Sequence, residues 1–138
     1  MLRLMSGLIL VTVLAVAGCR TAPLYNATDV NFASPASTSA ARLTLDDYRN
    51  AIIRGGAKRG WTFEDAGPGH LVGSVTVRGK HHAKVDVMFD TEQFSITHKA
   101  SQNLNYNPSR QQIHPNYNSW VSNLQQEIQA EITLMQAG

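Results

Sequence analysis

The feature that most constrains this chain is a short apolar run near its start, which ends at the only cysteine. Arg3 gives the run a basic start, the segment 8–17 is almost wholly apolar, and small residues lead into Cys19. A transmembrane helix needs about 20 consecutive apolar residues, so this run is too short to span a bilayer stably. A basic start, an apolar core and small residues before a cleavage point are typical of an export signal that is removed. We therefore predict that residues 1–18 form a signal peptide.

Cys19 is the predicted site of lipid attachment. Its thiol is the side-chain nucleophile that can form a thioether with a diacylglyceryl donor, and Ala17 and Gly18 fit a narrow peptidase site. The pattern resembles the bacterial lipobox, and the alternative is an ordinary secretory signal with a chance cysteine. Two or more acyl chains anchor durably because each buried CH₂ contributes about 0.8 kcal/mol. In Gram-negative lipoproteins an aspartate after the cysteine commonly causes inner-membrane retention. Here the residue is Arg20, which implies the periplasmic face of the outer membrane.

Composition excludes several classes of function. Twelve basic and ten acidic side chains give a net charge of +2, which falls by one when Arg3 is removed with the signal. The mature chain therefore lacks the basic surplus of nucleic-acid-binding proteins. Acylation of Cys19 leaves no free thiol, which excludes disulfides, thiol catalysis and cysteine-ligated metal sites. We expect no cofactor and no nucleic-acid partner.

The chain after the signal divides into a linker-like segment and one domain. Residues 19–42 are rich in Ala, Ser, Thr, Asn and Pro and hold few large apolar side chains. Such a segment cannot bury enough surface to offset its ordering entropy, which predicts a lipidated cysteine followed by a flexible tether. The pair Leu24 and Tyr25 is an exception that could dock on the domain. Residues 43–138 are enough for a single core of ordinary size.

Two helices are predicted, one at each end of the domain. Thr44 and Asp47 have the spacing of a capping box and start a helix that runs to about residue 58. A second helix starts near Pro115, which suits the first helical position, with His114 or a neighbour as its cap. Its apolar residues recur at helical spacing and form one continuous stripe: Tyr117, Trp120, Val121, Leu124, Ile128, Ile132 and Met135.

Between the helices the apolar residues alternate, as in half-buried strands. Four strands are predicted, one that begins at 61–63 and three at 70–78, 81–89 and 94–98, with a hairpin turn at Gly79 and Lys80. Short turns between them favour an antiparallel meander with one apolar face. Laying both helices on that face gives an α+β two-layer sandwich, in the order α-β-β-β-β-α. The other face is left uncovered, with the outward residues Val72, Ser74, Thr76, Arg78, Lys84, Asp86, Ser95 and Thr97.

Seven short segments of this domain are similar to an uncharacterised family of small Gram-negative lipoproteins. They are 51–52, 59–61, 68–71, 82–87, 94–96, 101–106 and 113–121. The resemblance spans about 45–132, which is nearly the whole domain. It implies an outer-membrane lipoprotein and supports the predicted fold, and it implies no activity and no catalytic residue.

The densest group of polar and aromatic residues follows the last predicted strand. The candidate binding residues are Asn103, Asn105, Tyr106, Asn107, His114, Asn116 and Asn118. Asn and Tyr offer hydrogen bonds and stacking area at low entropy cost, which suits recognition of a glycan or a peptide. The alternative is that these amides hold a long loop by bonding its own backbone, while Tyr117 and Trp120 fill the core.

Histidines and serines suggest two further kinds of site, and neither is favoured. Five histidines are present: His70, His81, His82, His98 and His114. His82 shares the outer face of its strand with Asp86 while His81 points the other way, so the adjacent pair cannot readily bind one metal ion. Ser101 near His98, or Ser119 near His114, could serve a hydrolase, but neither serine lies in a nucleophile-elbow pattern.

These observations together predict a lipid-anchored periplasmic binding or assembly module without catalytic activity. Its partners would be the membrane, through the lipid on Cys19, and another envelope protein, through the uncovered sheet face or the Asn-rich loop. The alternative is a ligand-binding lipoprotein for glycan or cell-wall fragments. A small hydrolase comes third.

Overall fold

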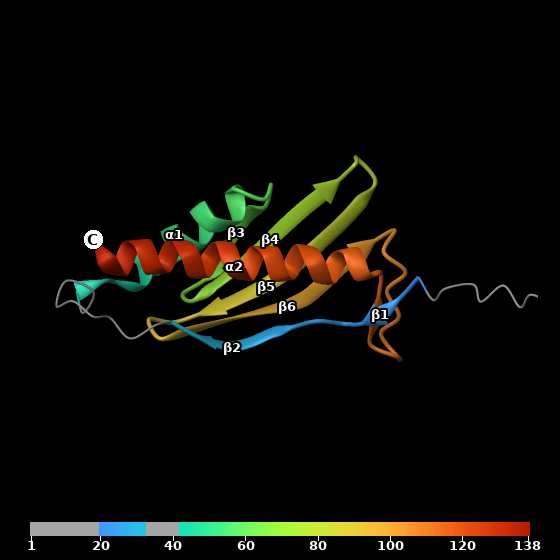
Figure 1. The fold of residues 1–138 in the computed structure, drawn as a ribbon, viewed down its shortest axis with the longest axis horizontal. Coiled ribbons are helices and arrows are strands. Elements are labelled where there is room, and N and C mark those ends of the chain that lie inside the picture. The colour runs from blue at the N-terminus through green and yellow to red at the C-terminus, as the bar shows by residue number, and fades with distance from the viewer. Residues whose placement is uncertain (1–19, 33–41) are drawn as a thin grey trace, which may run out of the picture.

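The computed structural model describes residues 20–32 and 42–138, so the predicted signal peptide and Cys19 lie outside the described residues. Two helices cover one face of a five-stranded antiparallel sheet (Figure 1). The predicted α+β class and two-layer arrangement are confirmed, with five strands in the sheet rather than four. None of the described helices combines the length and hydropathy needed to cross a bilayer.

The described part of the chain contains two helices and seven strands. They are β1 Ala22–Pro23, β2 Ala27–Asn31, α1 Leu45–Ala57, β3 Thr62–Gly67, β4 His70–Val77, β5 His81–Phe89, β6 Gln93–Gln102, β7 Gln112–Ile113 and α2 Pro115–Ala137. The five-stranded sheet has the order β2-β6-β5-β4-β3, and strands β1 and β7 form a separate two-stranded sheet.

The fifth strand comes from the segment that was predicted to be a tether. In β2, Ala27 lies opposite Ile96 and Val30 opposite Phe94, and β1 pairs with β7. The prediction of a flexible tether over 19–42 is therefore wrong for the described part, 20–32, whereas 33–41 lies outside the described residues. The reason is that small Ala27 is buried and that Leu24, Val30 and Phe32 also pack against the core.

The first helix begins and packs as its sequence indicates. Thr44 and Asp47 form the predicted capping box: the Asp47 carboxylate accepts from the Thr44 amide at 2.7 Å, and the Thr44 hydroxyl accepts from the Asp47 amide at 3.3 Å. The Thr44 amide and the Thr44 hydroxyl, which also donates to the Asp47 carboxylate at 3.0 Å, lower the pKa of the Asp47 carboxyl. Near its end α1 lies close to α2. A Cβ added at Gly55 would come within 2.9 Å of the Glu127 carbonyl oxygen, so this close approach requires glycine.

The second helix supplies the longest continuous part of the core. His114 is its N-cap and accepts a hydrogen bond from the Asn116 amide, and Pro115 follows at the first helical position, as predicted. Five residues of the predicted stripe are buried against the sheet: Tyr117, Val121, Leu124, Ile128 and Ile132. Trp120 and Met135 are partly buried and pack at the margin of this core.

Two details of the strands differ from the prediction. The β4–β5 turn is centred on Arg78 and Gly79, which both have positive φ, and not on Gly79 and Lys80. The Lys80 amide donates to the Val77 carbonyl across this turn, as in the tight turns that suit twisted hairpins. Strand β6 also continues to Gln102 instead of ending at 98, so the loop that was predicted from residue 100 starts later.

A β-bulge interrupts the pairing of β5 with β6. Val85 lies opposite His98 and Lys84 opposite Ala100, which leaves Lys99 as an extra residue on β6. An extra residue shifts the alternation of faces by one. His98 and Ser101 therefore lie on the same side of the strand, although they are three residues apart.

Candidate functional site

The predicted polar and aromatic cluster lies at one end of the sheet, which we call the loop end. It comprises the β4–β5 turn, the segment 103–111 and the β1–β7 sheet, and it lies at the right of Figure 1. Hydrogen bonds join these parts. The Asn103 side chain donates to the Lys80 carbonyl at 2.6 Å, and the Leu24 amide donates to the Gln111 carbonyl at 2.8 Å. Three segments that are distant in sequence therefore meet here.

Several predicted binding residues hold the backbone of this end in place. Asn103 and Asn105 adopt left-handed conformations, with φ of 60° and 52°. The Asn107 side chain accepts from the Arg110 amide at 3.1 Å. The Asn118 side chain accepts from the Tyr25 amide at 2.9 Å and donates to the Pro23 carbonyl at 2.8 Å. The alternative raised from the sequence, an amide that bonds the loop's own backbone, therefore describes Asn107, whereas Asn103 and Asn118 bond the backbone of other segments.

A pocket opens where the β4–β5 turn meets the start of α2. Its volume is about 310 Å³, and it is lined by Val77, Arg78, His81, Leu104, His114, Asn116 and Trp120. This volume is at the lower end of the range typical of small-molecule sites. His114 and Asn116 were candidate residues in the sequence, whereas Arg78 and His81 were not assigned to the cluster.

Hydrogen bonds fix the tautomers of the two histidines in this pocket. His81 Nδ1 lies 2.9 Å from the Asn103 carbonyl oxygen, and a carbonyl only accepts, so Nδ1 carries the proton. In the neutral ring, Nε2 of His81 is then an acceptor. His114 Nδ1 accepts from the Asn116 amide at 3.1 Å, so the proton of its neutral ring is on Nε2, a donor. The pocket thus offers one imidazole acceptor and one imidazole donor beside a guanidinium and an indole.

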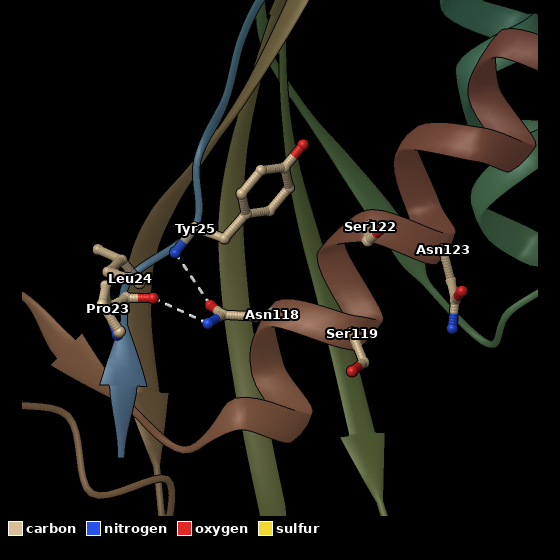
Figure 2. Close-up of a pocket in the computed structure, with 7 residues that line it drawn as sticks. All are labelled: Pro23, Leu24, Tyr25, Asn118, Ser119, Ser122 and Asn123. Carbon is tan, nitrogen blue, oxygen red and sulfur yellow. Dashed lines mark hydrogen bonds between the residues drawn. The ribbon is translucent and has the colours of Figure 1, made fainter.

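A broader groove runs between α2 and the segment 23–25. It is lined by Pro23, Leu24, Tyr25, Asn118, Ser119, Ser122 and Asn123 and has a volume of about 680 Å³. Figure 2 shows Asn118 between the two walls, bonded to both Pro23 and Tyr25. The Ser119 hydroxyl donates to the Pro115 carbonyl at 3.5 Å, so it is not directed to His114 as a hydrolase would need.

The other predicted serine does meet a histidine. His98 Nε2 lies 2.9 Å from Ser101 Oγ, because the β-bulge places both on one side of β6. The His98 ring packs on Tyr106 in a tilted arrangement, with the ring centroids 4.0 Å apart, and it meets Tyr117 edge-on, with centroids 5.4 Å apart. Burial lowers the pKa of His98. Among the described residues no carboxylate or amide bonds its Nδ1, the place of the orienting group in a triad.

The uncovered face of the sheet carries a small ionic network. His70 Nε2 lies 2.7 Å from the Asp86 carboxylate, and Lys99 Nζ lies 3.6 Å from it. Met88 is 48% exposed on the same face. In the described part of the chain, no group of three or more His, Cys, Asp or Glu side chains is placed to hold a metal ion.

Arg78 and His81 are the residues that sequence reasoning missed in the pocket. Both residues lie close to Gly79, where the sequence predicts a turn. The sequence does not show that the turn between the paired strands β4 and β5 lies beside the start of α2. Comparison of the chain with protein-family models, curated proteins and solved structures finds no match, so the site is interpreted from its own geometry.

Proposed function

We propose that this chain is a lipid-anchored, non-catalytic binding and assembly module of the bacterial cell envelope. Cys19 would hold it at the periplasmic face of the outer membrane, and another envelope protein would bind the domain. The observation that carries the binding part is the uncovered face of the five-stranded sheet, because both helices pack on the opposite face. The apolar run that ends at Cys19 supports the anchoring part.

The uncovered face has the properties of a protein-binding surface. Its central strands present short polar side chains, among them Ser74, Thr76 and Thr97. Exposed Met88 supplies an apolar contact, and the Asp86 network supplies hydrogen-bonding groups. Interface cores are enriched in methionine and rimmed by polar groups. A partner with a surface of mixed apolar and polar character would fit this face.

Anchoring is tested by a single substitution. In cells labelled with a fatty acid, the wild-type chain is expected to incorporate the label and to fractionate with the outer membrane. Cys19→Ser removes the thiol that would form the thioether, so the label should be lost. Incorporation in the Cys19→Ser variant would contradict the proposal, as would recovery of an unlabelled wild-type chain from the cytosol.

Binding through the sheet face is tested by site-specific crosslinking. A photo-reactive amino acid at Thr76, on the uncovered face, is expected to yield one protein adduct in intact cells. The same group at Ala130, which is exposed on α2, is the matched control and should not yield it. Met88→Lys should abolish the adduct, whereas Leu134→Lys, at an exposed apolar residue elsewhere, should not. Equal adducts at both positions would contradict binding by the sheet.

The loop-end pocket favours a second candidate function, binding of a glycan or cell-wall fragment. Trp120 offers a surface on which a sugar ring can stack, and His81, His114 and Arg78 offer an acceptor, a donor and a cation. A disaccharide-peptide fragment of the cell wall is the probe. It should shift the Trp120 indole signal and both imidazole signals in NMR spectra. Shifts confined to residues outside the pocket would exclude this candidate.

A further inference from the structure

The loop end lies next to the residue that would carry the lipid. Only Arg20 and Thr21 separate Cys19 from β1, and three residue steps span at most about 11 Å between Cα atoms. The Thr21 hydroxyl donates to the Gln112 side chain at 3.2 Å, so the chain is already attached to β7 there. A lipid on Cys19 would therefore place the β1–β7 sheet at the membrane surface rather than at the end of a long tether.

The same end of the domain has exposed basic side chains and lacks acidic ones. Three windows of the sequence, 20–28, 66–85 and 93–126, contain none of the ten Asp and Glu residues. The loop end is built from the first window, the end of the second and the middle of the third. It exposes four basic residues: Arg20, Arg78, Lys80 and Arg110.

The basic residues of the opposite half have acidic partners. Arg54 and Lys58 both pair with Glu131, at 3.3 Å for Arg54 and 2.5 Å for Lys58, and Arg59 pairs with Glu127 at 3.1 Å. The Lys58 ammonium lowers the pKa of the Glu131 carboxyl, which keeps that pair charged. The charge of the described domain is thus separated along its long axis, although the net charge of the chain is small.

From the position of Cys19 and this separation of charge we infer that the loop end docks on the bilayer, with its four basic residues against the phosphates of anionic phospholipids. The inference rests on the proposed acylation of Cys19. Basic residues close to an anionic leaflet are attracted to it, and the attraction falls off within a Debye length of about 10 Å, which the short link allows. In Figure 1 the loop end and the C-terminus lie at opposite ends of the long axis, so the uncovered sheet face would stand clear of the membrane.

A single introduced cysteine can report which end is near the membrane. The mature chain would have no other free thiol, since its only cysteine is acylated. Ser109→Cys places a fluorophore at the exposed tip of the loop end, and Thr91→Cys places it at the exposed β5–β6 turn at the other end. The acylated protein is reconstituted in phosphatidylcholine vesicles, with or without phosphatidylglycerol, that contain a headgroup-linked quencher. Quenching at Ser109 should be several-fold stronger than at Thr91 in the anionic vesicles.

A charge variant distinguishes docking through the basic residues from the closeness to the membrane that the lipid on Cys19 alone would cause. The triple variant Arg78→Gln, Lys80→Gln, Arg110→Gln should lose most of the excess quenching at the loop-end label, and so should omission of phosphatidylglycerol, while the protein still floats with the vesicles. The matched control is Arg54→Gln, Lys58→Gln, Arg59→Gln, which removes the same charge from the opposite half and should retain the quenching.

Each contrary result has a distinct meaning. Equal quenching at Ser109 and Thr91 in acylated, vesicle-bound protein would overturn the docking inference and leave the anchoring proposal intact. Full quenching in the loop-end triple variant would also overturn it, because the contact would then not depend on charge. A purified chain without lipid would overturn the anchoring proposal and, with it, this inference.

Discussion

His81 Nδ1 donates a hydrogen bond to the carbonyl oxygen of Asn103 at 2.9 Å, which joins the β4–β5 hairpin to the Asn-rich loop. The Asn103 side chain returns a bond to the Lys80 carbonyl at 2.6 Å. This reciprocal pair fixes one wall of the loop-end pocket and holds one imidazole nitrogen of His81 as an acceptor. A polar residue in a loop thus sets both the shape and the chemistry of the pocket.

Asn103→Ala is expected to destabilise the domain by about 1–2 kcal/mol. The change removes the bond to Lys80 and places a residue with a Cβ and no local hydrogen bond at a φ of 60°. Asn103→Gly should lose less, because glycine adopts this φ without strain. Urea unfolding measures both variants. Asn116→Ala, at an exposed position of the same pocket, is the control, and an equal loss there would contradict a specific role for Asn103.

Gly55→Ala is expected to destabilise the domain by about 1–3 kcal/mol, although alanine favours helix more than glycine does. The added Cβ would lie 2.9 Å from the Glu127 carbonyl oxygen and 3.0 Å from the Ile128 amide nitrogen, so the backbone of α2 would have to move. Asn50→Ala, at an exposed position of α1, should instead be neutral or slightly stabilising. Thermal unfolding of the two variants compares the effects, and a more stable Gly55→Ala would show that the helices are not in close contact.

Tyr117→Phe is expected to leave stability unchanged or to raise it by up to about 1 kcal/mol. The Tyr117 hydroxyl is buried without a hydrogen-bond partner among the described residues, and burial raises its pKa. Removing an unsatisfied buried hydroxyl removes a desolvation cost while the ring keeps its packing. The free energy of unfolding from denaturant titration gives the answer. A loss above 1 kcal/mol would mean that the hydroxyl does have a partner in solution.

Stability is expected to fall as the pH decreases through the titration of His98. Burial lowers the pKa of His98 in the folded domain below the ordinary value of about 6.5. The unfolded chain then binds the proton first, so the stability contributed by the neutral ring is fully present above pH 6.5 and is lost as the pH falls through the folded pKa. For one proton the slope is at most about 1.4 kcal/mol per pH unit.

Urea unfolding between pH 7 and pH 5 measures this slope, with His98→Phe as the comparison. The phenylalanine keeps an aromatic ring between Tyr106 and Tyr117 and cannot titrate. The variant should therefore have a shallower pH dependence than the wild type. An identical slope in both proteins would show that His98 contributes no pH dependence.

The helices and the central strands could be predicted from local pattern. The Thr44 and Asp47 pair specifies a helix start, and the stripe from Tyr117 to Ile132 specifies a buried helix face. Strand β2 could not be predicted in this way. A register shift between Ala27 and Val30, with Asp29 at a φ of 51°, breaks the alternation that identifies a strand.

Only some of the polar residues that line the pocket could be predicted from the sequence. His114 and Asn116 lie in the Asn-rich stretch, so composition marked them. Arg78 and His81 lie more than 30 positions earlier and reach the pocket through hairpin pairing. Arg78 also takes a left-handed φ of 56°, which a sequence does not indicate for arginine. Long-range pairing and unusual backbone angles are the two reasons that the site was incomplete.

The most direct test of the account is the mass of the N-terminal peptide of the protein purified from membranes. That peptide is expected to begin at Cys19 and to carry a thioether-linked diacylglyceryl group. The same mass should be absent from cells that produce only the Cys19→Ser variant. A peptide that begins at Met1, or one that begins at an unmodified Cys19, would contradict the central claim that a lipid places this domain at the membrane.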